Sequence, residues 1–387
     1  MSFVQNLTSR FYLSCDPSNP HQKNYRPHID GLRAIAVLSV VGYHFFPNWV
    51  KGGFVGVDIF FVISGFLIGG ILLDSLYNHS FSIKDFYARR VKRIFPALIV
   101  VLAATLAFGG FALLPEDFKN LGKHTVGGAG FIANLMFWKE SGYFDVASEK
   151  KELLHLWSLG VEEQFYIIFP LLLWGLTKKN LRLVTFIVLL FVASFYWNLA
   201  VYKKDPAFDF YSPVTRFWEL LAGVLLALWE RRHREGSLFF RCQPAINTIS
   251  SLARQIVFNP TSPPNNRAGA LSSFVSLAGI VFIVIALYKA KAAGFPGKQA
   301  LYPVLGAVCL IGAGSHALGN RLLLSLKPMV WIGLISYPLY LWHWPLITYA
   351  RVIVNGVPSR TLRISLLLVA ILLATLTYGF IEKPIRF

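Results

Sequence analysis

The sequence predicts an all-α polytopic membrane protein with about ten transmembrane helices and one further apolar segment that is non-spanning or re-entrant. The 387 residues are 55% hydrophobic and only 14% charged, and the mean hydropathy is +0.54. These values are typical of polytopic membrane proteins. The formal net charge is +18, but most basic residues lie in short runs between apolar segments, the pattern that orients a membrane protein. We therefore expect membrane lipid around the chain and no nucleic-acid partner.

Eleven apolar segments of roughly transmembrane length follow one another along the chain. They lie at about residues 29–47, 54–77, 94–114, 121–138, 157–176, 181–200, 214–230, 270–290, 300–317, 329–350 and 361–381. Basic linkers precede the first segment and also lie at 84–93, at 178–182 and in the loop 231–269, which has six arginines and one glutamate. If all eleven segments crossed the membrane, the linker 178–182 and the loop 231–269 would lie outside the cell. That placement opposes the tendency of basic loops to stay in the cytoplasm.

Segment 121–138 is the weakest candidate for a span, since it contains Gly127, Gly128, Gly130 and Asn134. If it stays outside or re-enters the membrane, residues 115–156 become an external excursion with five lysines and six acidic residues. Ten spans then remain, and both termini are cytoplasmic.

The predicted organisation is a cytoplasmic N-terminal segment over 1–28 and a transmembrane domain over 29–387. Segment 1–28 lacks the apolar stretch of a cleavable signal peptide, so we expect the first helix to act as an uncleaved signal. The loop 231–269 is rich in Ser, Pro and Asn and is expected to be a mobile cytoplasmic insertion. The three cysteines are scattered, which predicts neither a disulfide framework nor a bound metal.

The first apolar segment carries Arg33 and His44, eleven positions apart. Eleven residues of α-helix rise about 16 Å and turn three times plus roughly 20°, so the two side chains share one face. Ionisable groups inside a bilayer are costly and normally face a protein interior or a wet cavity. The pair therefore indicates chemistry along a transmembrane path, with Arg33 near the cytoplasmic surface and His44 in the outer third.

Asp58 and Glu162 fall at a depth similar to that of His44 when helix rise is counted from the predicted ends. A carboxylate inside an apolar helix needs a partner, and His44 on the preceding helix is the expected partner of Asp58. Such a pair would orient the imidazole and raise its basicity for general-base work on a hydroxyl or thiol. Glu162 and Glu163 are adjacent, so we expect only one of them to face the interior easily.

Each of these residues also has a plainer interpretation. Arg33 and the arginines at 89–93 could be anchors whose charged ends reach the membrane surface. His44 could belong to the interfacial belt of aromatic residues. His343, between two tryptophans, is expected to be such a belt residue.

Seven segments that contain these residues resemble the bacterial acyltransferase-3 family of membrane O-acyltransferases. They read YRPHIDGLRAIAVLSVVGYHFFP, GGFVGVDIFFVISGFLI, FYARRVKRIFPAL, LLHLWSLGVEEQFYIIFP, FYSPVTRFWELLAG, ISYPLYLWHWPL and YGFIEKPIR. The resemblance runs from about Tyr25 to Arg386. It places the family's Arg-x10-His motif on Arg33 and His44 and its Arg-x-x-Arg motif on Arg90 and Arg93.

The resemblance implies a multi-pass protein of the bacterial inner membrane with ten core helices. It also implies a cytoplasmic acyl-CoA donor, usually acetyl-CoA. The implied acceptor is a sugar hydroxyl of a surface polysaccharide or lipid-linked sugar, such as lipopolysaccharide O-antigen, exopolysaccharide or peptidoglycan. Many relatives continue into a periplasmic SGNH hydrolase-like domain, whereas this sequence ends at Phe387. A stand-alone member, a member with a separate periplasmic SGNH-type partner and a truncated form all remain open.

On this basis we expect Arg90 and Arg93 to bind the donor phosphates, because a guanidinium binds phosphate oxygens in a bidentate way. Arg33 would hold the donor at the mouth of the path. His44, oriented by Asp58, would deprotonate the acceptor hydroxyl or take the acyl group itself, and Glu162 would bind the sugar or hold the histidine. Two alternatives are a donor-loading subunit that acts with a separate transferase and a secondary transporter or flippase. The transporter should show internal repeats and interrupted helices.

Overall fold

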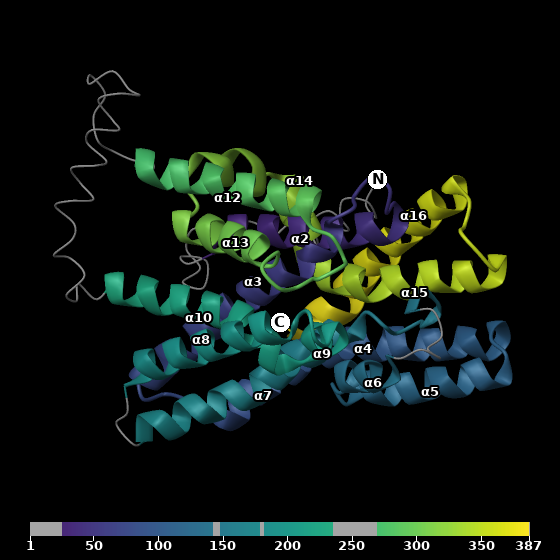
Figure 1. Cartoon of the computed structure of the whole chain (residues 1–387), viewed down its shortest axis with the longest axis horizontal. Coiled ribbons are helices and arrows are strands. Elements are labelled where there is room, and N and C mark those ends of the chain that lie inside the picture. The colour runs from purple at the N-terminus through teal and green to yellow at the C-terminus, as the bar shows by residue number, and fades with distance from the viewer. Residues whose placement is uncertain (1–24, 142–147, 179–181, 235–268, 387) are drawn as a thin grey trace.

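The computed structural model describes residues 25–141, 148–178, 182–234 and 269–386, and regular structure within these ranges is helical throughout. Figure 1 shows the long helices running roughly side by side. The α-helices are α2 (Pro27–Phe45), α3 (Gly56–Tyr77), α4 (Ile83–Ala112), α5 (Pro115–Ala129), α6 (Ala133–Glu140), α7 (Leu156–Lys178), α8 (Leu183–Val201), α9 (Pro206–Tyr211), α10 (Pro213–Arg234), α12 (Ala270–Lys289), α13 (Leu301–Ala313), α14 (Lys327–Leu334), α15 (Ser336–Val354), α16 (Arg360–Thr377) and α17 (Lys383–Arg386). Short 3-10 turns are η2 (Gly53–Val55) and η3 (Ser148–Lys150), and π-helical turns are η5 (Asn320–Leu324) and η6 (Tyr378–Glu382).

Six stretches of the described chain are long and apolar enough to cross a membrane. They are Gly53–Tyr77, Ile83–Ala112, Leu156–Thr177, Leu183–Val201, Ala270–Lys289 and Arg360–Ile385. Helices α2, α10 and α15 have 19, 22 and 19 residues but carry more polar or charged side chains, and α13 is a shorter apolar helix. The structure therefore confirms a helical membrane protein, and the count of ten spans stays a prediction.

No single helix covers the segment 121–138. It contains the end of α5 and most of α6, with a break at Gly130–Ile132 where Phe131 has a positive φ of 55°. Helix α5 packs against α4, and α6 packs against α7. The predicted single apolar segment 329–350 is also two helices, α14 and α15, which meet at Ile335. Residues 1–24 of the predicted N-terminal segment and most of the loop 231–269 lie outside the described residues.

Helix α3 lies at the centre of the bundle and α8 lies at its periphery. In the most apolar stretch of α3, 72% of the residues are buried. The corresponding shares are 17% in α8 and 22% in α12. The outward side chains of α8 and α12 are large and apolar, such as Leu189 and Phe274, as lipid contact requires.

Glycines bring two pairs of segments into backbone contact. A Cβ atom at Gly65 of α3 would lie 1.8 Å from the carbonyl oxygen of Leu220 in α10, and one at Gly31 of α2 would lie 1.9 Å from that of Leu324 in η5. Small residues allow this close approach between membrane helices. The contact at Gly65 holds α3 beside α10, and this contact decides the partner of Asp58.

Candidate active site

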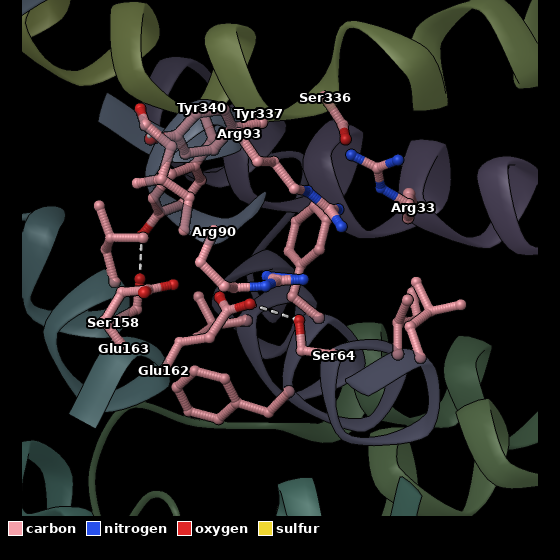
Figure 2. A pocket seen from close by; sticks show the side chains of 17 residues that line it. Arg33, Ser64, Arg90, Arg93, Ser158, Glu162, Glu163, Ser336, Tyr337 and Tyr340 are labelled. Carbon is pink, nitrogen blue, oxygen red and sulfur yellow. Dashed lines mark hydrogen bonds between the residues drawn. The ribbon is translucent and has the colours of Figure 1, made fainter. Parts of the chain in front are cut away.

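Five helices, α2, α3, α4, α7 and α15, enclose a cavity of about 90 Å³. Three guanidinium groups border it, those of Arg33 on α2 and of Arg90 and Arg93 on α4 (Figure 2). Two carboxyl groups also border it, Glu162 and Glu163 of α7. The remaining lining residues are Val57, Phe60, Phe61, Ile63, Ser64, Leu67, Ile94, Ser158, Leu159, Ser336, Tyr337 and Tyr340. Most of the cavity wall is therefore apolar, and the wall also carries three cationic guanidinium groups and two carboxyl groups.

Hydrogen bonds and ring contacts hold the charged groups of the cavity in place. Arg33 pairs with Asp30, one helical turn earlier, at 3.1 Å. The Arg90 guanidinium lies over the ring of Tyr166, 4.5 Å from its centroid. The Tyr166 hydroxyl in turn donates to Glu162 Oε1 at 2.5 Å. Arg90 and Glu162 are thus positioned by the same tyrosine, and these groups are fixed before any ligand binds.

The position of Glu162 differs from the sequence prediction. We expected it at the depth of His44, where it would bind the sugar or hold the histidine. It lies instead among the predicted donor-binding arginines, where the Ser64 hydroxyl also donates to it at 2.5 Å (Figure 2). Glu163 borders the same cavity and is only 6% exposed. Both neighbours reach the cavity because it extends around the start of α7, so side chains about 100° apart on the helix both meet it.

His44 forms a hydrogen-bonded pair with His343 of α15. His44 Nδ1 lies 3.0 Å from His343 Nε2, and the two rings are nearly parallel, with an interplanar angle of 16° and centroids 5.2 Å apart. His343 is fully buried, and its Nδ1 lies 2.6 Å from the carbonyl oxygen of Tyr340. The indole of Trp344 and the His44 ring pack edge to face at a centroid distance of 4.5 Å. The expectation that His343 is an interfacial belt residue was wrong.

Two arginines bind the C-terminal end of α2 next to His44. Arg351 donates from Nη2 to the carbonyl oxygen of His44 at 3.1 Å, and Arg363 donates to that of Phe45 at 2.9 Å. The last carbonyl groups of a helix have no partners within the helix and carry partial negative charge, so cations stabilise them. These bonds fix the backbone that carries the His44 ring.

Asp58 does not pair with His44. Its Oδ1 accepts from Arg216 Nη2 at 3.0 Å, and Arg216 Nε lies 3.2 Å from Glu219. All three side chains are fully buried. The predicted pairing failed because α3 lies against α10, which supplies a cation at the depth of Asp58. A cation neutralises a buried carboxylate better than an imidazole does.

The cavity and the histidine pair are separate but adjacent. His44 is not among the residues that line the cavity, so the expected open path from Arg33 to His44 is not one continuous space. Tyr340 borders both, because it lines the cavity and its ring lies 5.4 Å from that of His343. Its hydroxyl lies 2.6 Å from that of Ser158, another lining residue. The two sites thus share one side chain as a wall.

The sequence predictions did not include Arg216 or Tyr340, and they included His343 only as a belt residue. Arg216 and Glu219 stand three positions apart in an apolar helix, a spacing that brings two side chains together and could have identified the ion pair. His343 lies one helical turn after Tyr340 on the same face, but no pattern in the sequence indicates that this face meets α2.

Comparison with known proteins places the chain among acyltransferases. Residues 26–379 match the family described as "Acyltransferase domain", the acyltransferase-3 family. The peptidoglycan O-acetyltransferase OatA of Listeria monocytogenes is 34% identical over 95% of this chain and 56% of its own length. The putative peptidoglycan O-acetyltransferase YrhL of Bacillus subtilis is 35% identical over 94% of this chain and 55% of its length. The O-acetyltransferase OatA of Staphylococcus aureus is 30% identical over 95% and 58%.

The chain thus spans a little over half the length of these curated relatives. No solved structure matches it.

Proposed function

The chain belongs to the acyltransferase-3 family, and from this premise we propose that it is an integral membrane O-acyltransferase that moves an acetyl group from cytoplasmic acetyl-CoA to a hydroxyl of a cell-surface carbohydrate. The observation that carries the proposal is the cavity on which three buried or half-buried arginines converge, separated by one residue from the hydrogen-bonded pair of His44 and His343.

The donor is proposed from the charge of the cavity. Coenzyme A is a polyanion with a long uncharged arm, and guanidinium groups bind phosphate oxygens strongly. A cavity of about 90 Å³ holds only a small part of such a molecule. We assign Arg90 and Arg93 to the phosphates, and Arg33 to the mouth of the path toward α2.

The acceptor is proposed from the relatives. Two of the three are named for peptidoglycan, so a hydroxyl of cell-wall glycan is the acceptor class we favour within surface carbohydrates. Nothing in these names supports lipopolysaccharide. The chain's location in the cytoplasmic membrane, with both termini in the cytoplasm, is part of the same proposal and rests on the distribution of its basic residues.

His44 is proposed as the general base. Its imidazole takes the proton from the acceptor hydroxyl while the oxygen attacks the thioester carbonyl. The carbon–sulfur bond then breaks, and the CoA thiolate leaves and takes the proton from the imidazolium. A positioned general base contributes about 10²- to 10⁴-fold to the rate. Asp58 has no place in this step, because it neutralises Arg216.

The test is acetyl transfer by the purified chain in lipid nanodiscs. Radiolabelled acetyl-CoA and a peptidoglycan disaccharide are supplied, and both release of the CoA thiol and labelling of the sugar are measured. The wild type should do both without any ion gradient. His44→Ala should lose about 10²-fold or more of the rate, whereas the exposed His316 changed to alanine should not. Equal rates for wild type and His44→Ala would overturn the proposal.

A further inference from the structure

We propose that His343 is a positioning residue that fixes which nitrogen of His44 is basic. In this arrangement His44 carries its proton on Nδ1 and presents the lone pair of Nε2 to the acceptor. The inference deepens the proposed function of His44, but the tautomer itself is set by contacts that do not depend on any substrate.

His343 makes a hydrogen bond to the backbone of its own helix. Its Nδ1 lies 2.6 Å from the carbonyl oxygen of Tyr340. A carbonyl oxygen accepts hydrogen bonds and never donates them. The proton on His343 must therefore be on Nδ1, and in the neutral ring Nε2 is left as an acceptor.

The rings of His343 and His44 also contact each other. His343 Nε2 and His44 Nδ1 are 3.0 Å apart, a normal hydrogen-bond distance. Since His343 Nε2 accepts, His44 Nδ1 must donate. A neutral His44 then has no proton on Nε2, which makes that nitrogen the base. His44 thus donates to His343, and His343 donates to the Tyr340 carbonyl.

The arrangement is rigid. His343 is fully buried, and the carbonyl oxygen of Tyr340 that accepts from it belongs to the backbone of the same helix, α15. On the other side, Arg351 fixes the backbone of His44. A rotation of either ring would place two donors or two acceptors against each other, which is costly in a buried site.

The role proposed for His343 is one that a carboxylate often plays beside a catalytic histidine. An imidazole accepts the same hydrogen bond without adding a negative charge. This suits a buried position that, among the described residues, has no cation bound directly to either ring. Tyr340 supplies the backbone carbonyl that fixes the tautomer, and the same residue lines the cavity in which the donor is proposed to bind.

The experiment is a measurement of which His44 nitrogen is protonated. The chain is labelled with ¹⁵N in its nine histidines, placed in lipid bilayers and examined by solid-state NMR at neutral pH. The His44 signals are identified as those lost in His44→Gln. The expected result is a protonated Nδ1 and an unprotonated Nε2. Protonation of His44 at Nε2 with a bare Nδ1 would overturn the proposal, whatever the activity of the protein.

Variants of His343 separate positioning from packing. The amide oxygen of His343→Gln can accept from His44 Nδ1, whereas His343→Leu cannot. We expect the glutamine variant to keep the His44 tautomer and to transfer acetyl at least about tenfold faster than the leucine variant. The matched control is His155→Gln. Its ring lies 5.8 Å from that of His343, but no hydrogen bond among the described residues joins it to either ring of the pair. The His44 tautomer should be unchanged in this control. A leucine variant that keeps both the tautomer and the wild-type rate would overturn the role of His343.

Discussion

Replacement of Asp58 by asparagine distinguishes a structural role of this carboxylate from a chemical one. In the structure Asp58 binds Arg216 at 3.0 Å, and Glu219 binds the same guanidinium at 3.2 Å. Asp58→Asn removes one charge but leaves Glu219 as a counter-ion and keeps an acceptor oxygen. We therefore expect the loss of one charged hydrogen bond, about 1.5–3 kcal/mol of the free energy of unfolding.

Arg216→Met is the matched comparison. It leaves two fully buried carboxyl groups without their cation, and breaking a buried ion pair from one side costs about 3–5 kcal/mol. Four aromatic rings surround the guanidinium at 5.5–6.0 Å from their centroids, so little water can enter to compensate. The arginine variant should therefore be clearly less stable than the aspartate variant.

Stability is measured by SDS titration of the purified protein, and acetyl transfer is measured on the folded fraction alone. The expected result for Asp58→Asn is a lower stability with a rate per folded molecule within about threefold of the wild type. This follows because no hydrogen bond among the described residues joins Asp58 to His44. An Asp58→Asn protein with full stability and no transfer would refute the reasoning and restore the role that the sequence suggested.

Three further predictions concern the cavity, the helix contacts and pH. Arg90→Ala should raise the apparent KM for acetyl-CoA by about 10- to 100-fold, since a charge-assisted bond to phosphate is lost. The KM is measured from initial rates at varied donor concentration, and an unchanged KM would mean that Arg90 does not bind the donor. Gly65→Ala should destabilise the protein by about 3 kcal/mol or more in the same SDS titration, because its Cβ would lie 1.8 Å from a backbone oxygen. Gly70→Ala on the same helix meets nothing within 4 Å and should stabilise it by about 0.5–1 kcal/mol; equal effects at the two sites would contradict the packing. Burial raises the pKa of Glu152 from 4.5 to about 7, so the folded state binds the proton more tightly and stability should fall as pH rises from 4.5 to 7. Glu152→Gln should remove this part of the decline, and identical pH profiles of thermal unfolding would contradict it.

The sequence was sufficient for the helical membrane fold, because transmembrane apolar segments and basic linkers are local features. It also predicted that Arg33, Arg90 and Arg93 act at one place, and the structure brings all three to one cavity. The partners of Asp58 and Glu162 could not be predicted from depth alone. Depth along a helix says how far a side chain lies from the membrane surface, but not which neighbouring helix it faces.

His343 illustrates the same limit from the other side. A histidine between two tryptophans is typical of an interfacial belt, and this was the expected role. Its true position depends on the contact between α15 and α2, which are separated by about 300 residues of sequence. The contact is tertiary, so no local pattern reveals it. The same holds for Arg216, whose partner Asp58 comes from α3.

The most direct test of the account is a cryo-electron microscopy structure of the chain with a non-cleavable thioether analogue of acetyl-CoA. We expect the phosphates to lie against Arg90 and Arg93. The ligand should pass Tyr340 and bring its carbonyl within about 4 Å of His44 Nε2. Movement of the Tyr340 ring, with its backbone kept in α15, should open the wall that now separates the cavity from the histidine pair. An analogue bound away from the three arginines, or a carbonyl that remains far from His44 with Tyr340 in place, would contradict the account.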